Sequence, residues 1–415
     1  MSHAAVIRSL SSTSGRPAMT RNVSRRPADH MAVDAAAEDL APLFERAPPI
    51  TMKAALAIDV WRRAIAFGVL AWLPLILLAA LQELWNPAVR LGSILAEVGL
   101  HARYLLAVPL FVLAERFCAP QLGTILANFI HGGLVADADR AAFDRAIVST
   151  QARLRSTVAE IVIVILAYCV SAVTVLTYTY EELPAWALSV DRTTLSLAGW
   201  WHALVSLPLL LALCLGWLWR VALWAQLLRS LARLKLRLIA SHPDRCAGLA
   251  FLGQSVRAFS IVGMAVMMVA AGRSAQLVLS GGATPTQNFY FNIGLAAALL
   301  VIFVVPLLAF TPSLMGAWRH GMLEYGALAA RAGHAFEAKW LKADHVDGEI
   351  LEQPDSSALT DLYQVVANVG SLRFVPVGLK DLAMLVIAML VPFVPVVLLA
   401  IPVSVIMASL RGLLF

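Results

Sequence analysis

The stretch FNIGLAAALLVIFVVPLLAF, residues 291–310, contains one strongly polar side chain, that of Asn292. A helix needs roughly 20 apolar residues to cross the ~30 Å hydrocarbon core of a bilayer, so this stretch predicts a membrane-spanning helix. Six other stretches are comparably apolar: 65–84, 104–122, 158–180, 200–227, 259–279 and 382–410. The sequence therefore predicts an all-α fold, a polytopic transmembrane helical bundle of about seven spans.

Composition agrees with a membrane protein. Hydrophobic residues make up 60% of the 415, and the mean hydropathy is +0.78, whereas about half of a soluble domain is apolar. The formal net charge is +6, but the basic residues gather between spans on one side. We therefore expect the lipid bilayer as a partner, and no nucleic acid.

Lysine and arginine are divided unequally between the two sides of the predicted bundle. Of the 32 residues, 25 lie on the side of the N-terminus, four lie on the other side and three lie within spans. Cytoplasmic segments of membrane proteins carry such an excess of basic residues. The sequence thus predicts a multi-pass protein of the cell inner membrane with a cytoplasmic N-terminus.

The chain divides into four parts. Residues 1–50 predict a disordered cytoplasmic tail, and residues 51–310 predict spans 1–6 with their cytoplasmic loops. Residues 311–380 predict a cytoplasmic helical segment, because Thr311-Pro312 is typical of a helix start and a second helix is expected near Asp355. Residues 381–415 form a proline-rich last span.

The last span permits two interpretations. Proline removes a backbone donor and clashes with the preceding turn, and this span contains Pro392, Pro395 and Pro402. It is either one kinked crossing or two half-helices that enter and return, which would leave six spans and a re-entrant segment. A broken helix also predicts a gate or a coordination site at these three prolines.

Charged residues within spans are the first candidates for function, because a charge at the centre of a membrane helix costs roughly 2.5–3.5 kcal/mol. Arg273 lies in the fifth span, and Glu115 and Arg116 lie in the second. One hypothesis is a polar seam between helices, lined by these three residues. The alternative is that they reach the interface or pair with one another to fix helix packing.

The most distinctive polar motif is His242-Pro-Asp-Arg-Cys-Ala-Gly248. Asp244 is placed to cap the helix that leads into the fifth span, and Gly248 is expected to allow a close approach. A gate or a partner-docking turn is the functional alternative. His242, Asp244 and Cys246 lack a second cluster of ligands, so we predict no metal.

The motif continues to Leu252 as HPDxxxGLxFL, and with the proline-rich last span it resembles multi-spanning inner-membrane proteins of proteobacteria that carry no functional name. The resemblance covers roughly residues 50–415. It implies an inner-membrane location and assigns no substrate.

These patterns predict a channel or transporter that passes a small ion or solute through the polar seam, with a homo-oligomer possible. The alternative is a non-transporting scaffold or sensor that docks a cytoplasmic partner. The chain lacks a P-loop, a GxGxxG after a strand, an HExxH and a GxSxG motif. We therefore expect no enzyme activity and no cofactor.

Overall fold

The computed structural model describes residues 59–85, 91–177, 184–189, 194–280, 288–340 and 354–400. The predicted tail at 1–50, Pro402 and the end of the predicted last span lie outside these ranges. The described residues form helices and turns and contain no β-strand. Two isolated β-bridges are the only strand-like pairings among them.

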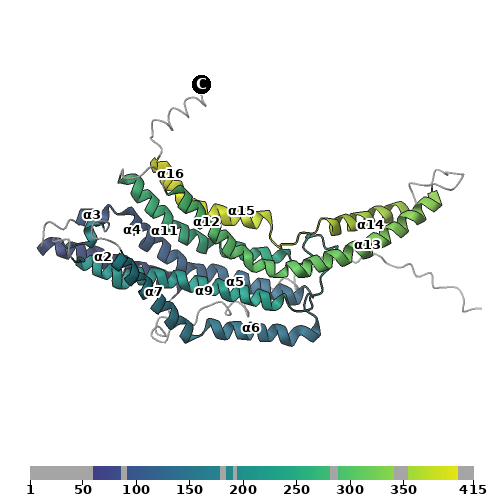
Figure 1. The fold of residues 1–415 in the computed structure, drawn as a ribbon, viewed down its shortest axis with the longest axis horizontal. Coiled ribbons are helices and arrows are strands. Elements are labelled where there is room, and N and C mark those ends of the chain that lie inside the picture. The colour runs from purple at the N-terminus through teal and green to yellow at the C-terminus, as the bar shows by residue number, and fades with distance from the viewer. Residues whose placement is uncertain are drawn as a thin grey trace, which may run out of the picture.

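The fold is the predicted all-α bundle (Figure 1). Seven helical segments of the described chain are long and apolar enough to cross a membrane: Val60–Trp85, Val98–His131, Thr157–Thr177, Leu197–Leu231, Ala250–Leu279, Phe289–Lys339 and Leu379–Leu399.

Several of these segments consist of successive helices that continue one another. The first three segments contain α2 (Val60–Trp85), then α4 (Val98–His101), η3 (Ala102–Ala107) and α5 (Val108–His131), then α7 (Thr157–Thr177). The fourth and fifth contain α8 (Leu197–Trp201), η6 (His202–Ser206) and α9 (Leu207–Leu231), then η7 (Ala250–Gly253), α10 (Gln254–Ala258) and α11 (Ser260–Leu279). The last two contain α12 (Phe289–Val304), η8 (Val305–Phe310) and α13 (Thr311–Trp340), then α15 (Leu379–Leu390), η10 (Val391–Phe393) and α16 (Val394–Ala400).

Four shorter elements connect the spans: α3 (Leu91–Leu95), η4 (Asp137–Asp139), α6 (Arg140–Leu154) and η5 (Ala185–Ala187). One further helix, α14 (Pro354–Gly370), pairs with α13.

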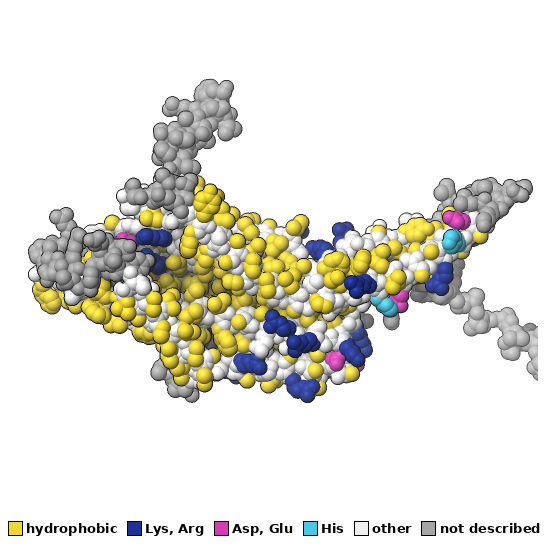
Figure 2. Space-filling model, viewed as in Figure 1, with side chains coloured by type: hydrophobic (Ala, Val, Ile, Leu, Met, Phe, Trp, Pro, Cys, Tyr) yellow, Lys and Arg dark blue, Asp and Glu magenta, His cyan; other side chains and the backbone are white. Residues whose placement is uncertain are grey.

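Small residues allow the spans to approach closely. A Cβ on Gly272 of α11 would lie 2.5 Å from the Ala102 Cβ and 3.4 Å from the Gly99 Cα, so these two helices touch through their backbones. Helices in lipid associate through such packing because the bilayer supplies no hydrophobic drive between them. Outward-facing side chains are apolar, above all on α7, and Figure 2 shows hydrophobic side chains over most of the visible bundle.

The bundle has one basic end, which we define as the end where α2 begins and α5 finishes. The segment Val98–His131 has 34 residues, about 50 Å of helix, whereas the hydrocarbon core is ~30 Å thick. The chain therefore extends beyond the bilayer here, and the hydrophobic core continues with it: the Phe129 ring packs against those of Phe143, Phe251 and Phe310 at distances of 5.3 to 6.2 Å. Lys and Arg side chains gather over α6 and toward α13 (Figure 2).

A helical hairpin projects from the basic end. α13 continues directly from the span that contains α12, and α14 packs against it (Figure 1). The second helix of the hairpin begins at Pro354, one residue before the expected position. The expected helix start at Thr311 is not found, because Thr311 has a helical backbone (φ −54°, ψ −44°) and η8 continues through it into α13.

The last described segment, Leu379–Leu399, is long enough for one crossing and packs along α11. Pro392 is buried within the 3-10 turn η10, which joins α15 to α16 without reversing the chain. The described part of this segment therefore agrees with a single kinked helix.

Candidate functional site

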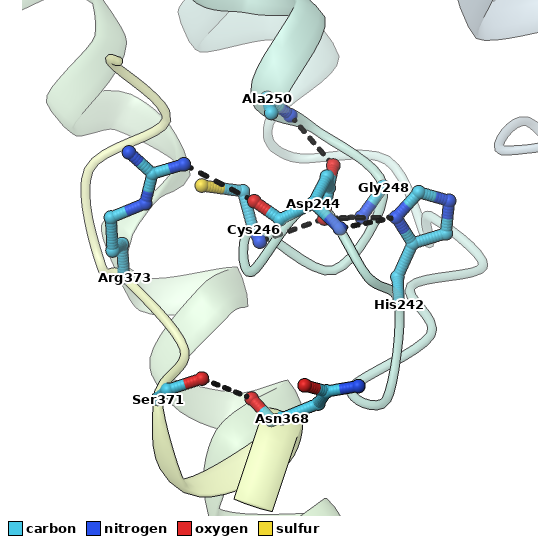
Figure 3. Close-up of polar contacts among 8 residues, drawn as sticks. All are labelled: His242, Asp244, Cys246, Gly248, Ala250, Asn368, Ser371 and Arg373. Atoms are coloured by element: carbon cyan, nitrogen blue, oxygen red, sulfur yellow. Dashed lines mark hydrogen bonds and ion pairs between the residues drawn. The ribbon is translucent and has the colours of Figure 1, made fainter. Parts of the chain in front are cut away.

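The loop between α9 and η7 is organised by the carboxylate of Asp244. Its Oδ1 accepts the backbone N–H groups of Cys246 at 2.8 Å and Gly248 at 3.1 Å, and its Oδ2 accepts that of Ala250 at 3.0 Å (Figure 3). His242 Nδ1 lies 2.9 Å from Asp244 Oδ1 and completes the set. Because Ala250 is the first residue of η7, the Asp244 carboxylate binds a free N–H group at the start of this helix, although Leu249 stands at the N-cap position.

Three residues of this loop have left-handed backbone conformations. Arg245, Ala247 and Gly248 have φ values of 56°, 53° and 93°. Only glycine adopts such conformations without cost, so the first two are strained. We expected Gly248 to allow close approach, but a Cβ there would meet only Leu134 at an ordinary 3.5 Å. Its positive φ is therefore the reason for glycine.

The hydrogen bonds of Asp244 determine its charge. Burial alone would raise the pKa of this carboxyl, but the N–H groups of Ala250, Cys246 and Gly248, together with His242, outweigh burial and lower the pKa. Asp244 is therefore ionised near neutral pH, and its bonds to the loop are charge-assisted. Burial raises the pKa of the neighbouring Cys246 thiol, which consequently stays protonated.

Arg373, which follows α14, locks the loop to the hairpin. Its Nη2 donates to the Asp244 carbonyl at 3.1 Å, and its backbone N–H donates to the Arg245 carbonyl at 2.7 Å. Nη1 donates to the Val377 carbonyl at 3.2 Å, so one guanidinium joins both sides of the contact. Arg373 was not among the predicted site residues, because 129 positions separate it from Asp244.

The α13–α14 hairpin is held at its base by a group of contacts that we call the hairpin root. Its residues are Trp318, Gly321 and Tyr325 of α13, Ala240 and Ser241 of the loop, and Val369 to Phe374. The rings of Trp318 and Phe374 meet edge to face at 5.7 Å, and the Ser241 and Tyr325 hydroxyls are 3.2 Å apart. A Cβ on Gly321 would lie 2.5 Å from the Ala240 Cβ, so glycine allows the loop to touch the helix.

The predicted polar seam contains a carboxylate between two arginines. Glu115 of α5 pairs with Arg220 of α9, and its other oxygen lies 3.4 Å from Nη2 of Arg63 in the first turn of α2. The Arg220 guanidinium also lies 4.6 Å above the Trp217 ring. Three helices are thus joined at one level, and two of the three charged residues, Arg63 and Arg220, were not among the predicted seam residues.

The other two seam candidates lie elsewhere. Arg116 is exposed beside Glu115, outside the network. Arg273 is exposed on α11 and has no ion pair or hydrogen bond with another described residue. Cys118, three residues from Glu115 on α5, donates its Sγ–H to the carbonyl of Ala258, the last residue of α10. Arg273 lies 15 residues beyond Ala258, on α11, so the structure does not bring it to Glu115.

Two of the gate candidates are described. Pro392 is buried and Pro395 is exposed, while Pro402 lies outside the described residues. A gate at these prolines remains a prediction.

A second polar feature lies deeper in the bundle, between two π-helices. η3 precedes Pro109 and η6 precedes Pro208. Between them the His202 ring packs edge to face on Tyr104 at 5.9 Å and on Trp186 at 5.5 Å. The Tyr104 hydroxyl, His202 Nε2 and Trp186 Nε1 are buried and have no hydrogen-bond partner in the described chain. π-Helices occur often at functional sites.

The fold and these sites define a polytopic helical membrane protein. Comparisons with protein-family models, with curated proteins and with solved structures find no match. Among the described residues no three His, Cys, Asp or Glu side chains are grouped as metal ligands.

We predict that Asp244→Asn destabilises the protein by about 2 kcal/mol, since hydrogen bonds to a charged group are each worth roughly 1.5–3 kcal/mol. Folding lowers the Asp244 pKa, so its contribution is complete above the unfolded value of about 3.9 and is lost as the pH falls through the folded-state pKa. Thermal unfolding in detergent at several pH values measures both effects. Asp144→Asn on α6, where Asp144 is 57% exposed and has one partner, is the matched control. Equal midpoints for the two variants would contradict the capping role.

We also predict that Glu115→Gln destabilises the bundle by about 3 kcal/mol, because it leaves the buried Arg220 charge without its carboxylate. Arg116→Gln, at the exposed neighbouring position, should change the unfolding midpoint little. A comparison of both variants in detergent checks the network, and a Glu115→Gln midpoint as high as that of Arg116→Gln would argue against it.

Proposed function

We propose that this chain is a multi-pass protein of the bacterial inner membrane, with its basic end in the cytoplasm, whose bundle anchors a docking platform for a cytoplasmic protein. The excess of basic residues at that end and the resemblance of the Asp244 loop support this location. The role is non-catalytic: the platform is the α13–α14 hairpin, held by the hairpin root.

The observation that carries the proposal is the way the hairpin is held. Beyond Tyr325, α13 continues for 15 residues, about 22 Å, with α14 as its neighbour. At the root, three independent contacts tie it down: Arg373 to the loop, Tyr325 to Ser241, and Thr311 Oγ1 to the Phe374 carbonyl at 2.9 Å. A hairpin that projects from the bundle and is fixed at its base is suited to presenting a surface (Figure 1).

The surface of the hairpin has the composition of an interaction surface. Leu323 is 75% exposed and Leu328 is 44% exposed on α13, and Tyr363 of α14 is 48% exposed. The exposed pairs His320–Glu324 and His334–Glu337 add polar side chains to the same helix, α13. Apolar and aromatic side chains with a polar rim are the usual anatomy of a protein interface.

The test is photo-crosslinking in intact cells, with a photoreactive amino acid at Leu323 or Leu328. We expect a discrete protein adduct from the hairpin positions. Leu176 on α7, which is 83% exposed, is the matched control and should yield no protein adduct because lipid surrounds it. An absence of protein adducts from the hairpin would reject the platform, and an adduct of two copies of the 44.7 kDa chain would assign the surface to a homo-oligomer instead.

Passage of a small ion or solute is the second candidate, and the buried polar atoms between the π-helices favour it. Unpartnered polar groups in a bilayer cost several kcal/mol each, so Tyr104, His202 and Trp186 require a polar ligand or water. Tyr104 lies 11 residues, about 16 Å, along the helix from Glu115, which is far inside the bundle.

If transport is the function, proteoliposomes that contain the wild-type chain leak protons or K⁺ faster than empty liposomes. His202→Leu should then reduce the rate several-fold, and Arg116→Gln serves as control. Equal leakage in all preparations, empty liposomes included, would defeat this candidate.

A further inference from the structure

An extended segment, residues 233–238, follows the end of α9 and alternates between apolar and basic side chains. Its apolar members are partly buried against the hydrophobic core: Leu234, Leu236 and Leu238. Its basic members are exposed, and we call them the basic row: Arg233, Lys235 and Arg237. Successive side chains of an extended chain point to opposite sides. The leucines therefore hold the segment on the protein while the three cations face outward together.

Backbone contacts fix the position of this segment. Leu236 forms an antiparallel bridge with Val135, and the N–H group of Arg237 donates to the Leu134 carbonyl at 2.8 Å. Side chains at alternate positions of an extended chain are spaced by roughly 6–7 Å. The basic row is therefore a line of three cations with a defined spacing.

The basic row has no ion pair with any residue that the structure describes. Asp137 and Asp139 of η4 follow Val135 along the chain, yet neither pairs with a cation of the row. Arg229, in the last turn of α9, is also exposed and adds positive charge next to the row. Figure 2 shows more Lys and Arg than Asp and Glu side chains at this end of the bundle. The charge of the row is thus available to an anionic partner.

The position of the row favours a partner from the cytoplasm over a lipid headgroup. Arg220 of α9 is joined through Glu115 to Arg63, in the first turn of the first span. From Arg220, α9 continues for 11 residues to Leu231, about 16 Å, and the row comes after its end. Exposed charges are largely screened beyond roughly 8 Å at physiological salt. With the basic end in the cytoplasm, the row therefore lies too far along α9 to attract headgroups strongly.

We propose that the basic row binds an acidic segment of the partner protein, extended and with carboxylates at alternate positions. Alternate side chains of such a segment have the same spacing as the row, so three carboxylates meet Arg233, Lys235 and Arg237 in register. The two arginines can bind their carboxylates through two hydrogen bonds each. The row leads directly into Ala240 and Ser241 of the hairpin root, so one partner can contact the hairpin and the row. The inference rests on the docking function proposed above and names the chemistry of its partner.

The test is fluorescence anisotropy of the full chain in detergent with two labelled peptides of equal length and composition. One alternates glutamate and threonine, and the other has its glutamates in one block. We expect the alternating peptide to bind roughly three- to fivefold more tightly than the block peptide. The combined row variant Arg233→Gln, Lys235→Gln and Arg237→Gln should weaken its binding roughly tenfold, because three exposed ion pairs of ordinary strength together account for about that factor.

A control variant removes the same charge elsewhere on the basic end. Arg145→Gln, Arg153→Gln and Arg155→Gln replace three exposed arginines on and just after α6. This variant should weaken binding at most about twofold, through the long-range field alone. Thermal unfolding shows that both variants are folded, and the row variant keeps the leucines that pack against the core.

Equal affinity for the two peptides would overturn the proposal, as would a row variant that binds no more weakly than the control variant. Tighter binding of a labelled oligothymidylate of equal charge, lost in the row variant, would assign the row to nucleic acid instead. Phosphatidylglycerol adducts that native mass spectrometry finds on the wild type but not on the row variant would assign it to lipid. Hairpin crosslinks without peptide discrimination would reject the acidic segment and leave the platform, and the reverse result would reject the platform alone.

Discussion

Inside a bilayer every backbone polar group needs a partner from the protein, and this constraint shapes the spans of the chain. Pro208 provides no N–H to the preceding turn, so carbonyls of that turn lose their helical donor. The adjacent span replaces it: Ser171 Oγ donates to the Ala203 carbonyl at 2.7 Å, and the Tyr168 hydroxyl donates to the Leu204 carbonyl at 3.0 Å. Because Tyr168 and Ser171 must point at these carbonyls, Pro208 determines which face of α7 turns toward the segment of η6 and α9.

The same constraint explains where the charges are. The Glu115 carboxylate is shared by Arg63 and Arg220 at the level where α2 begins, so the buried Arg220 has an opposite charge beside it. Beyond this level water can reach the protein, and a loop such as that of Asp244 becomes possible. Its strained conformations at Arg245 and Ala247 are retained because the carboxylate binds three backbone N–H groups at once.

Local patterns were sufficient to predict the spans, the second hairpin helix near Asp355 and the contact of Asp244 with the start of η7, because each depends on residues within a few turns. The partners could not be predicted in this way. Arg373 reaches Asp244 across 129 positions, and Glu115 selects Arg63 and Arg220 over its neighbour Arg116 through the packing of three helices. A signal for the π-helices was present: Gly, His-Ala and Pro recur in that order in residues 99–109 and 199–208.

The platform has a physical connection to the membrane through the two segments that hold the hairpin root. The loop of Asp244 runs into α10 and α11, and the segment of Arg373 runs into α15. These segments meet again where Arg257 pairs with Asp381 at 2.8 Å, and a Cβ on Gly253 would collide with that carboxylate. Because α11 and α15 also pack against each other, a displacement of the root must either move both spans together or break the Arg257–Asp381 pair. Binding at the hairpin and the geometry of these two spans are therefore linked by direct contacts.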